Sequence, residues 1–389
     1  MSAVRTTYLP FHRPSIGDEE VQAVAETLRS GWLTSGPKVQ EFENAFAEAI
    51  GARHAVALSS ATAALHLSLE AIGIGPGDEV LVPAMTFTAT AEVVVHLGAK
   101  PVLVDCRPET LNIDPASVEA AITSRSRAIV PVHMGGLACD MDHLGDIAAR
   151  HGLVIVEDAA HALPTTWRGA LVGAISPLTC FSFYATKTIT TGEGGMVTTD
   201  DDARAARIRL MSLHGISRDG WARYTAAGSW QYEVHEAGFK NNMSDLAAAL
   251  GIEQLRKLRV FRDRRAWIAQ QYDTAFAAMP EIGLPPRDGR SEHAWHLYVI
   301  QLALERLRVD RAQFIAELKA RNIGASVHFI PLHRHPYYQR TLGVGPDDFP
   351  AATAAFHRIV SLPIFPAMSD ADAADVIAAV SDIVRCHRR

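Results

Sequence analysis

A lysine that follows an apolar strand is the residue with the clearest chemistry in this sequence. The run FSFYATKTITTGEGGMV, residues 181–197, starts as a strand and reaches Lys187 just before a glycine-rich turn. Glycine lets the backbone approach a ligand closely, and a lysine amine held at such a place can attack a carbonyl carbon. An isolated lysine at a strand exit is more often a surface residue, so the neighbouring motifs have to decide its role.

A carboxylate ends another apolar strand. The run LVIVED, residues 153–158, ends in Asp158 and is followed by AAHA. In parallel α/β folds the carboxyl ends of the strands face the crevice where ligands bind. A carboxylate there can keep a pyridine nitrogen protonated, which pyridoxal phosphate (PLP) requires to accept electrons. The alternative is that Asp158 is the N-cap of a following helix.

Two more segments fit a phosphorylated aromatic cofactor. The run SSATAAL, residues 59–65, places small residues at a helix start, where free N–H groups and the helix dipole favour a phosphate. Ser182 is a second phosphate-facing candidate. In PAMTFTATA, residues 83–91, Phe87 follows a strand end and can stack on a flat ring; its alternative role is core packing.

Strands and helices alternate along the first half of the chain. Because the strands are apolar throughout, we expect a mostly parallel sheet covered by helices on both faces. After residue 200 this alternation stops, and the remainder indicates a smaller α+β domain. We therefore expect a large domain over residues 1–250 and a small domain over residues 251–389. The strands are expected at 54–58, 79–83, 101–105, 127–132 and 153–158, and the helices at 17–30, after 59, and within 243–279.

Composition excludes several classes of function. The net charge is −6 and no basic run occurs, so a nucleic-acid partner is not expected. The four cysteines lack the spacing of a metal site or a disulfide framework. No signal peptide or membrane-spanning stretch is visible, and we expect a cytoplasmic protein without a metal.

The motifs together carry a family resemblance. The ordered set ATAAL, PAMTFTAT, EDAAHA, FSFYATKTITTGEGGMV, GFKNNMSDLAAALG, HLYVIQL, VHFIPLH and SLPIFP resembles the nucleotide-sugar aminotransferases of the DegT/DnrJ group over nearly the whole chain. The resemblance implies the PLP-dependent aspartate aminotransferase fold. It also implies a homodimer whose active sites are shared between the subunits.

The resemblance implies specific roles around the cofactor ring. Lys187 matches the lysine that forms the Schiff base with PLP and later shuttles a proton. Asp158 matches the partner of the pyridine nitrogen, and His161 matches a residue that binds near the ring hydroxyl. Phe87 matches the aromatic residue stacked on one ring face, with Ala160 on the other.

The resemblance also implies the phosphate contacts. Ala61, Thr62 and Ser182 match phosphate-binding positions, and Asn242 matches an asparagine that reaches the phosphate from the neighbouring subunit. Two positions depart from the family pattern: Ala61 replaces a common glycine, and GFKNNM replaces a common GYNYRM. Asn241 is the second choice for the asparagine. The alternative for Asn242 is an N-cap of its own helix.

Four residues are candidates for the substrate side. GWLTSG, residues 31–36, resembles the family's N-terminal active-site loop, so Trp32 or Thr34 is expected to touch the sugar; the alternative is a helix C-cap turn. Tyr184 and His328 are the other two candidates, and a packed or surface histidine is the alternative for His328. Four other histidines (His133, His214, His293 and His296) receive no role.

The expected reaction moves an amino group from an amino acid, taken as L-glutamate, to a keto group of a nucleotide-linked deoxy sugar, with C4 favoured over C3. A keto-cyclitol is the alternative acceptor. A dehydratase of the same family would carry histidine in place of Lys187. A dinucleotide-dependent oxidoreductase is disfavoured because GIGPG, residues 73–77, follows a helix rather than a strand. A non-catalytic regulatory or binding protein on the same scaffold is disfavoured because both Lys187 and Asp158 are present.

Overall fold

In the computed structural model of the chain, the fold is built around one large sheet. The model describes residues 5–216 and 232–389, and no helix in these two ranges is long and apolar enough to cross a membrane. The large sheet has seven strands in the order β1-β9-β8-β5-β4-β2-β3. Its strands are β1 (His54–Leu58), β2 (Glu79–Pro83), β3 (Lys100–Val104), β4 (Ser126–Ile129), β5 (Val154–Asp158), β8 (Leu178–Ser182) and β9 (Gly195–Thr199).

The strand directions confirm the prediction of a mostly parallel sheet. The strands β8, β5, β4, β2 and β3 pair in parallel, and β9 runs antiparallel to both β1 and β8. The five strands predicted from apolar runs lie within two or three residues of the observed ones. The carboxyl ends of the parallel strands therefore meet at one edge, where the motif residues follow them.

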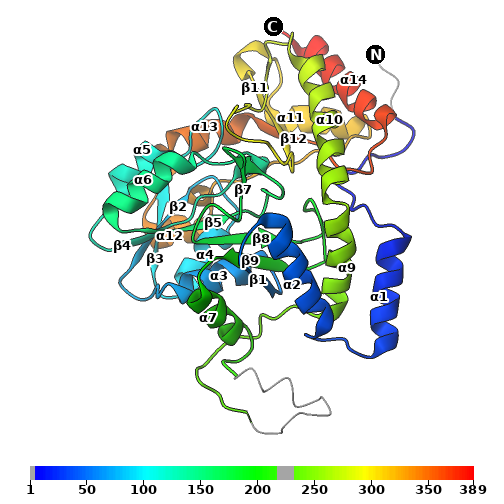
Figure 1. The fold of residues 1–389 in the computed structure, drawn as a ribbon. Coiled ribbons are helices and arrows are strands. Elements are labelled where there is room, and N and C mark those ends of the chain that lie inside the picture. Colours follow the sequence, from blue (N-terminus) through cyan, green and yellow to red (C-terminus); the bar gives the residue numbers. More distant parts are fainter. Residues whose placement is uncertain (1–4, 217–231) are drawn as a thin grey trace.

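Helices cover both faces of this sheet (Figure 1). One face packs against α3 (Ala61–Ala71), α4 (Ala89–His96) and α7 (Asp202–Ser212). The opposite face packs against α2 (Pro37–Ile50) and α9 (Asp245–Arg256), and further along against α5 (Pro115–Ala121) and α6 (Met141–His151). A parallel sheet buried on both faces explains why its strands are apolar throughout.

The C-terminal part of the chain has its own sheet and core. Its three strands, β10 (Ile282–Gly283), β11 (Tyr298–Leu302) and β12 (Ile359–Leu362), are antiparallel. The remaining elements are α1 (Asp18–Ser30), α10 (Leu258–Phe276), α11 (Arg311–Ala320), α12 (Pro336–Leu342), α13 (Pro350–Arg358), α14 (Asp370–His387), the hairpin β6 (Thr166–Trp167) and β7 (Ala170–Leu171), and short 3-10 turns η1 (Met134–Gly136), η2 (Leu304–Arg306), η3 (Leu332–Arg334) and η4 (Pro346–Asp348).

Two observations bear on the expected division at residue 250. Residue 250 lies inside α9, and the N-terminal segment joins the C-terminal part through a bridge between Leu9 and Ile323 (Figure 1). The core around the large sheet also includes Leu297 and Leu332 from the C-terminal part, so the cores do not separate at residue 250, and the division into 1–250 and 251–389 stays a prediction.

The buried face of α9 differs from the expected one. The apolar residues Leu246, Ala247, Leu250, Ile252 and Leu255 predict a face that packs inside the chain; Ile252 is buried and Ala247 and Leu255 pack against the same core, whereas Leu246 and Leu250 do not belong to it. The helix instead buries small residues and two polar ones, Ala248, Ala249, Gly251, Asp245 and Gln254. Small residues let α9 lie close to α1 and α2, which explains the difference.

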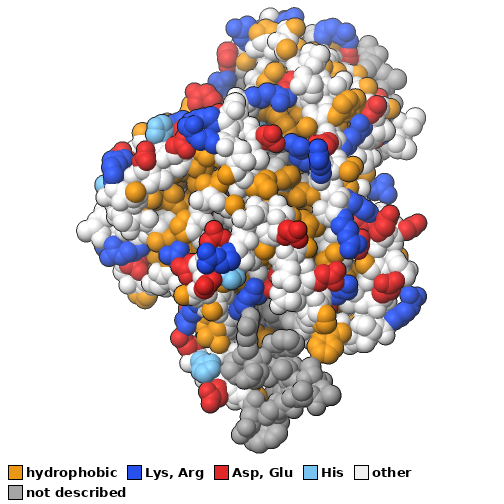
Figure 2. All heavy atoms as spheres, in the orientation of Figure 1, with side chains coloured by type: hydrophobic (Ala, Val, Ile, Leu, Met, Phe, Trp, Pro, Cys, Tyr) orange, Lys and Arg blue, Asp and Glu red, His pale blue; other side chains and the backbone are white. Residues whose placement is uncertain are grey.

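Figure 2 shows where hydrophobic, basic and acidic side chains lie on the face presented in Figure 1. Hydrophobic side chains gather across the middle of this face. Basic and acidic side chains are interspersed around them, so neither sign forms a continuous area on the face shown.

Candidate active site

Lys187 lies in the loop between β8 and β9, at the carboxyl edge of the parallel strands. Its backbone N–H donates to Tyr184 O at 2.9 Å. Phe183 O accepts two hydrogen bonds that close the loop, one from Thr191 N at 2.9 Å and one from Thr190 Oγ1 at 3.0 Å. Burial lowers the pKa of the Lys187 amine to about 8, although the nearby Asp158 opposes this shift. The amine is therefore neutral far more often than an ordinary lysine, as a nucleophile requires.

Asp158 ends β5 on the sheet face that packs against α3 and α4. Its carboxylate is buried and accepts from Thr90 Oγ1 at 2.9 Å and from Ala160 N at 3.1 Å. Burial raises its pKa, and no ion pair among the described residues includes it. The helix N-cap alternative is wrong, because turns and not a helix follow Asp158. A buried carboxylate with spare acceptor capacity suits a protonated ring nitrogen.

His161 lies in the turn that follows β5. Its Nδ1 accepts from Gly135 N at 3.3 Å, so the neutral ring carries its proton on Nε2. Burial, with the charge of Lys187, holds the pKa of His161 well below its usual range. Its ring stacks on Phe329 at a centroid distance of 5.6 Å and lies 4.4 Å from the ring of His296. His161 can therefore donate Nε2–H to an oxygen.

The start of α3 is open to a phosphate. Ser60 is the N-cap and accepts from Ala63 N, whereas the N–H groups of Ala61 and Thr62 have no partner within the helix. Gly195 of β9 lies so close that an added Cβ would be 2.3 Å from Ser60 O. Ser182 lies opposite Gly195 in the β8–β9 pair, so these predicted phosphate contacts come together.

Asn242 lies beside the end of β1 in its own chain. It forms a bridge with Leu58, and its side chain donates from Nδ2 to Ser35 Oγ at 2.7 Å and accepts at Oδ1 from Lys240 Nζ at 2.6 Å. The alternative that Asn242 caps its own helix is wrong, because Ser244 is the N-cap of α9. The contact with a neighbouring subunit stays a prediction.

The 31–36 loop is tied to the same segment as Asn242. Asp245 N donates to Thr34 O at 3.1 Å, Ser35 Oγ donates to Met243 O at 2.7 Å, and Trp32 Nε1 donates to Ser35 O at 3.3 Å. The helix-end alternative holds, since Gly31, the first residue of the loop, is the C-cap of α1. Trp32 and Thr34 therefore lie with Asn242, and their substrate role stays a prediction.

Tyr184 and His328 lie on the Lys187 side of the site. The Tyr184 side chain is 47% exposed and is free to meet a ligand. His328 Nδ1 is 2.9 Å from Ser361 Oγ, and its ring stacks on Phe11. Burial, with the charge of Lys187, lowers the pKa of His328 to about 4, so it is neutral at pH 7.

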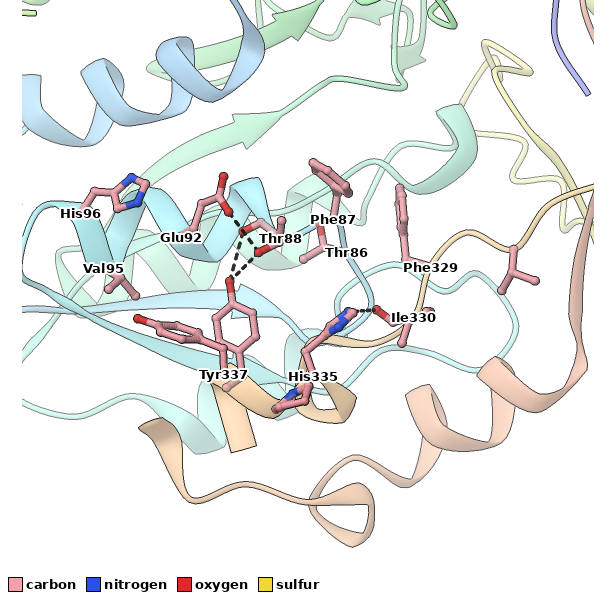
Figure 3. Close-up of a pocket in the computed structure, with 13 residues that line it drawn as sticks. Thr86, Phe87, Thr88, Glu92, Val95, His96, Phe329, Ile330, His335 and Tyr337 are labelled. Carbon is pink, nitrogen blue, oxygen red and sulfur yellow. Dashed lines mark hydrogen bonds between the residues drawn. The ribbon is translucent and has the colours of Figure 1, made fainter. Parts of the chain in front are cut away.

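Phe87 borders a large open cavity (Figure 3). The core-packing alternative for Phe87 is wrong, because its side chain is 58% exposed. The cavity measures about 750 Å³ and also contacts Phe329, whose ring lies 6.0 Å from that of Phe87. Figure 3 shows Glu92, His335 and Tyr337 around the same space. Its volume is within the roughly 300–1,000 Å³ usual for small-molecule pockets.

Three contacts of the site were missed in the sequence. Thr90 lies inside the PAMTFTATA motif, where its hydroxyl donates to Asp158 and accepts from Thr86 Oγ1 at 2.8 Å. Gly135 and Phe329 contact His161 from distant loops. The PAMTFTATA motif points to the segment that contains Thr90. No local sequence pattern indicates that the backbone N–H of Gly135 contacts His161.

The residues brought together fit PLP. A lone buried carboxylate, Asp158, complements the protonated pyridine nitrogen, and neutral His161 offers a donor for the ring hydroxyl. The free N–H groups at the start of α3 suit the phosphate, and the amine of Lys187 suits the cofactor's carbonyl carbon.

Comparison with known proteins decides the family. The sequence profile of the DegT/DnrJ/EryC1/StrS aminotransferase family matches residues 14–381. The chain belongs to this family. With the family shown, the fold and the cofactor follow: this member is a PLP-dependent sugar aminotransferase.

Individual members of the family are similar over almost their full length. The Bacillus subtilis spore coat polysaccharide biosynthesis protein SpsC is 53% identical over 382 residues, 98% of each chain. The putative sugar aminotransferase Spr1654 of Streptococcus pneumoniae, solved in a PLP form, is 34% identical with a TM-score of 0.91 over 97% of this chain and 99% of its own. Helicobacter pylori PseC, an aminotransferase of pseudoaminic acid biosynthesis, is 27% identical with a TM-score of 0.91 over 98% of this chain and 100% of its own.

Proposed function

We propose that the enzyme transfers the amino group of L-glutamate to the C4 keto group of a nucleotide-linked deoxy sugar in amino-sugar biosynthesis. The observation that carries the proposal is the convergence of a lysine of lowered pKa, a buried unpaired carboxylate and a neutral histidine donor at the carboxyl edge of one sheet. Lys187 and Asp158 are its catalytic residues.

The chain's own residues have distinct tasks in this reaction. Bound PLP supplies the electron sink that makes removal of an α-proton possible. The neutral amine of Lys187 removes the proton from the donor's α-carbon, for which its pKa near 8 is suitable. Asp158 keeps a proton on the pyridine nitrogen, and His161 donates from Nε2 to the ring hydroxyl oxygen.

The relatives and the space beside Phe87 support a sugar as the acceptor. SpsC is named for polysaccharide biosynthesis and PseC for pseudoaminic acid biosynthesis, and both names point to sugar products. The cavity of about 750 Å³ beside Phe87 has room for a sugar or a nucleotide, although its lining includes neither Lys187 nor Asp158, so it would hold the part of the substrate away from the reacting carbon. Trp32, Thr34, Tyr184 and His328 are the side chains proposed to meet the substrate.

We further propose a homodimer in which Asn242 binds the cofactor phosphate of the neighbouring subunit. The side chain is half-buried and held by Ser35 and Lys240, so it is fixed in orientation. Ala61, Thr62 and Ser182 supply donors from the same subunit as Lys187, and a charged phosphate accommodates an additional donor.

A substrate panel tests the proposal. The purified holoenzyme is incubated with L-glutamate or L-glutamine and with nucleotide-linked 4-keto sugars, 3-keto sugars and keto-cyclitols, and the amino products are identified by NMR. Turnover of a 4-keto sugar with glutamate is the expected result. Turnover of keto-cyclitols alone would establish the alternative acceptor, and absence of PLP from the purified protein would revive the non-catalytic alternative.

A further inference from the structure

A buried pair of ionisable side chains lies directly behind the site. His133 Nε2 is 2.7 Å from Glu157 Oε2, and both side chains are fully buried. Neither side chain has a task in the proposed reaction. Burying such a pair costs more than packing apolar residues in the same space, so a role beyond stability is worth seeking.

The pair is connected to Asp158 through the backbone of β5. Glu157 precedes Asp158 and points to the opposite face of the sheet, where Thr179 Oγ1 also donates to it at 2.9 Å. The N–H of His133 donates to Asp158 O at 3.3 Å, and Asp158 N donates to Pro131 O at 2.9 Å. Fixing Glu157 therefore fixes the rotation of the strand end, and with it the direction of the Asp158 carboxylate.

The same pair is connected to His161 through the turn η1. Gly136 N donates to His133 O at 3.1 Å, and the preceding Gly135 N donates to His161 Nδ1 at 3.3 Å. Gly136 approaches so closely that an added Cβ would be 2.9 Å from His161 O. A shift of His133 would therefore move the N–H that fixes the proton of His161 on Nε2.

The hydrogen bonds define the protonation of His133. Cys139 N donates to His133 Nδ1 at 3.0 Å, so Nδ1 is an acceptor and the ring proton lies on Nε2. His133 thus donates from Nε2 to the Glu157 carboxylate. His133 is held by hydrogen bonds at its backbone N–H and at both ring nitrogens. The pair thereby connects the η1 turn, β5 and β8 into one rigid support.

We propose that the His133–Glu157 pair is a positioning device that sets both groups facing the cofactor ring, Asp158 and His161. The proposal rests on the proposed function in one respect, namely that these two groups meet PLP. Neither His133 nor Glu157 is proposed to touch the cofactor ring. Each residue acts through its neighbouring backbone.

The test compares Glu157→Met with a matched control, Glu79→Met. Glu79 is also buried and hydrogen-bonded in the same sheet, but it starts β2, at the strand end away from the site. The readout is the pH at which the visible absorbance of the lysine-bound cofactor changes. A misplaced Asp158 leaves the pyridine nitrogen less protonated. We therefore expect Glu157→Met to raise this midpoint by about one pH unit and to lower kcat about tenfold or more. Glu79→Met should leave the midpoint and kcat near their wild-type values.

Two further variants separate positioning from general destabilisation. In an Asp158→Asn background, Glu157→Met is expected to move the midpoint no further, because the group it positions is already lost. If Glu157→Met does not fold, Glu157→Gln replaces it and should move the midpoint part-way in the same direction, since it keeps an acceptor for His133 but loses the charge. An unmoved midpoint in the folded variant, or a shift that persists in the Asp158→Asn background, overturns the inference. A wild-type protein without a lysine-bound cofactor would instead overturn the proposed function.

Discussion

At the scale of single residues, the site holds a buried carboxylate, two histidines that are neutral at pH 7, and a lysine whose amine loses its proton about two and a half pH units earlier than an ordinary lysine, at a pKa of about 8 against 10.5. Burial raises the pKa of Asp158, lowers that of Lys187 to about 8, and keeps His161 and His328 uncharged. If Asp158 meets the ring nitrogen as proposed, its carboxylate acts strongly on the cofactor, because burial weakens the screening of its charge.

We predict that Asp158→Asn loses turnover without losing the cofactor. The amide keeps the size of the side chain and can still bond with Thr90 and Ala160, but it cannot hold a proton on the ring nitrogen. We expect kcat to fall by about 100-fold or more with PLP occupancy nearly unchanged. Occupancy is measured by PLP release and turnover by product formation. Near-normal turnover would show that the carboxylate is only structural.

We predict that the buried amine of Lys187 destabilises the apoprotein in a pH-dependent way. Its pKa is about 8 in the folded state against an ordinary 10.5, so burial of the charged form is unfavourable below pH 8. As pH rises from 8 to 10.5, the unfolded state still binds the proton that the folded state has lost, and wild-type stability increases. Lys187→Met should therefore raise the free energy of unfolding at pH 7 by about 1–3 kcal/mol and by less at pH 9.5. Urea unfolding of both apoproteins measures this, and a gain that does not change with pH contradicts the prediction.

At the scale of elements, the proposed phosphate site depends on how closely α3 approaches β9. The N-terminus of α3 supplies N–H groups and the positive end of the helix dipole. Gly195 allows this approach because it has no side chain facing Ser60. The glycine-rich run that follows Lys187 in the sequence therefore allows both the turn and the close packing of β9 against the start of α3.

We predict that Gly195→Ala weakens PLP binding. The new Cβ would lie 2.3 Å from Ser60 O and 2.6 Å from Ala61 N, both backbone atoms, so the helix start has to move. We expect the dissociation constant of PLP to rise about tenfold or more. Gly145→Ala in α6 is the control, because nothing lies within 4 Å of its added Cβ. Equal PLP affinity in the two variants, measured by fluorescence titration, would exclude this role.

The sequence predicted some elements and contacts well and others poorly, for physical reasons. Apolar runs predict β1 to β5, and the small-residue run from Ser59 predicts the start of α3, because those signals are local. The antiparallel direction of β9 and the buried face of α9 depend on which distant elements pack together, and no local pattern contains this information. The motifs indicate Asp158 and His161 as candidates, whereas the hydrogen bonds that fix them, from Thr90 and Gly135, become visible only in three dimensions.

At the scale of the whole molecule, the proposed contact of Asn242 with the cofactor phosphate requires two subunits. Asn242 and the 31–36 loop form one hydrogen-bonded unit through Ser35 and Asp245, located beside the end of β1. In a symmetric dimer a residue that serves the neighbouring site does so reciprocally, so each chain would complete the other's phosphate site.

We predict that two inactive variants restore activity when mixed. If Asn242 acts across the interface, a mixed dimer of Lys187→Ala and Asn242→Asp carries both lesions in one site and leaves the other site intact. Refolding equal amounts together should recover about a quarter of wild-type activity, because half of the dimers are mixed and each has one intact site. Mass spectrometry confirms the mixed dimers. Formation of mixed dimers without recovery of activity would place Asn242 in its own subunit's site.

The most direct test of the account is the covalent partner of the cofactor. The purified protein is treated with borohydride, which fixes lysine-bound PLP to its amine, and the labelled peptide is identified by mass spectrometry. The lowered pKa of Lys187 and its place at the carboxyl edge of the sheet predict a yellow protein whose colour is lost on reduction, with the label on Lys187 alone. A label on another lysine, or none, would contradict the central claim.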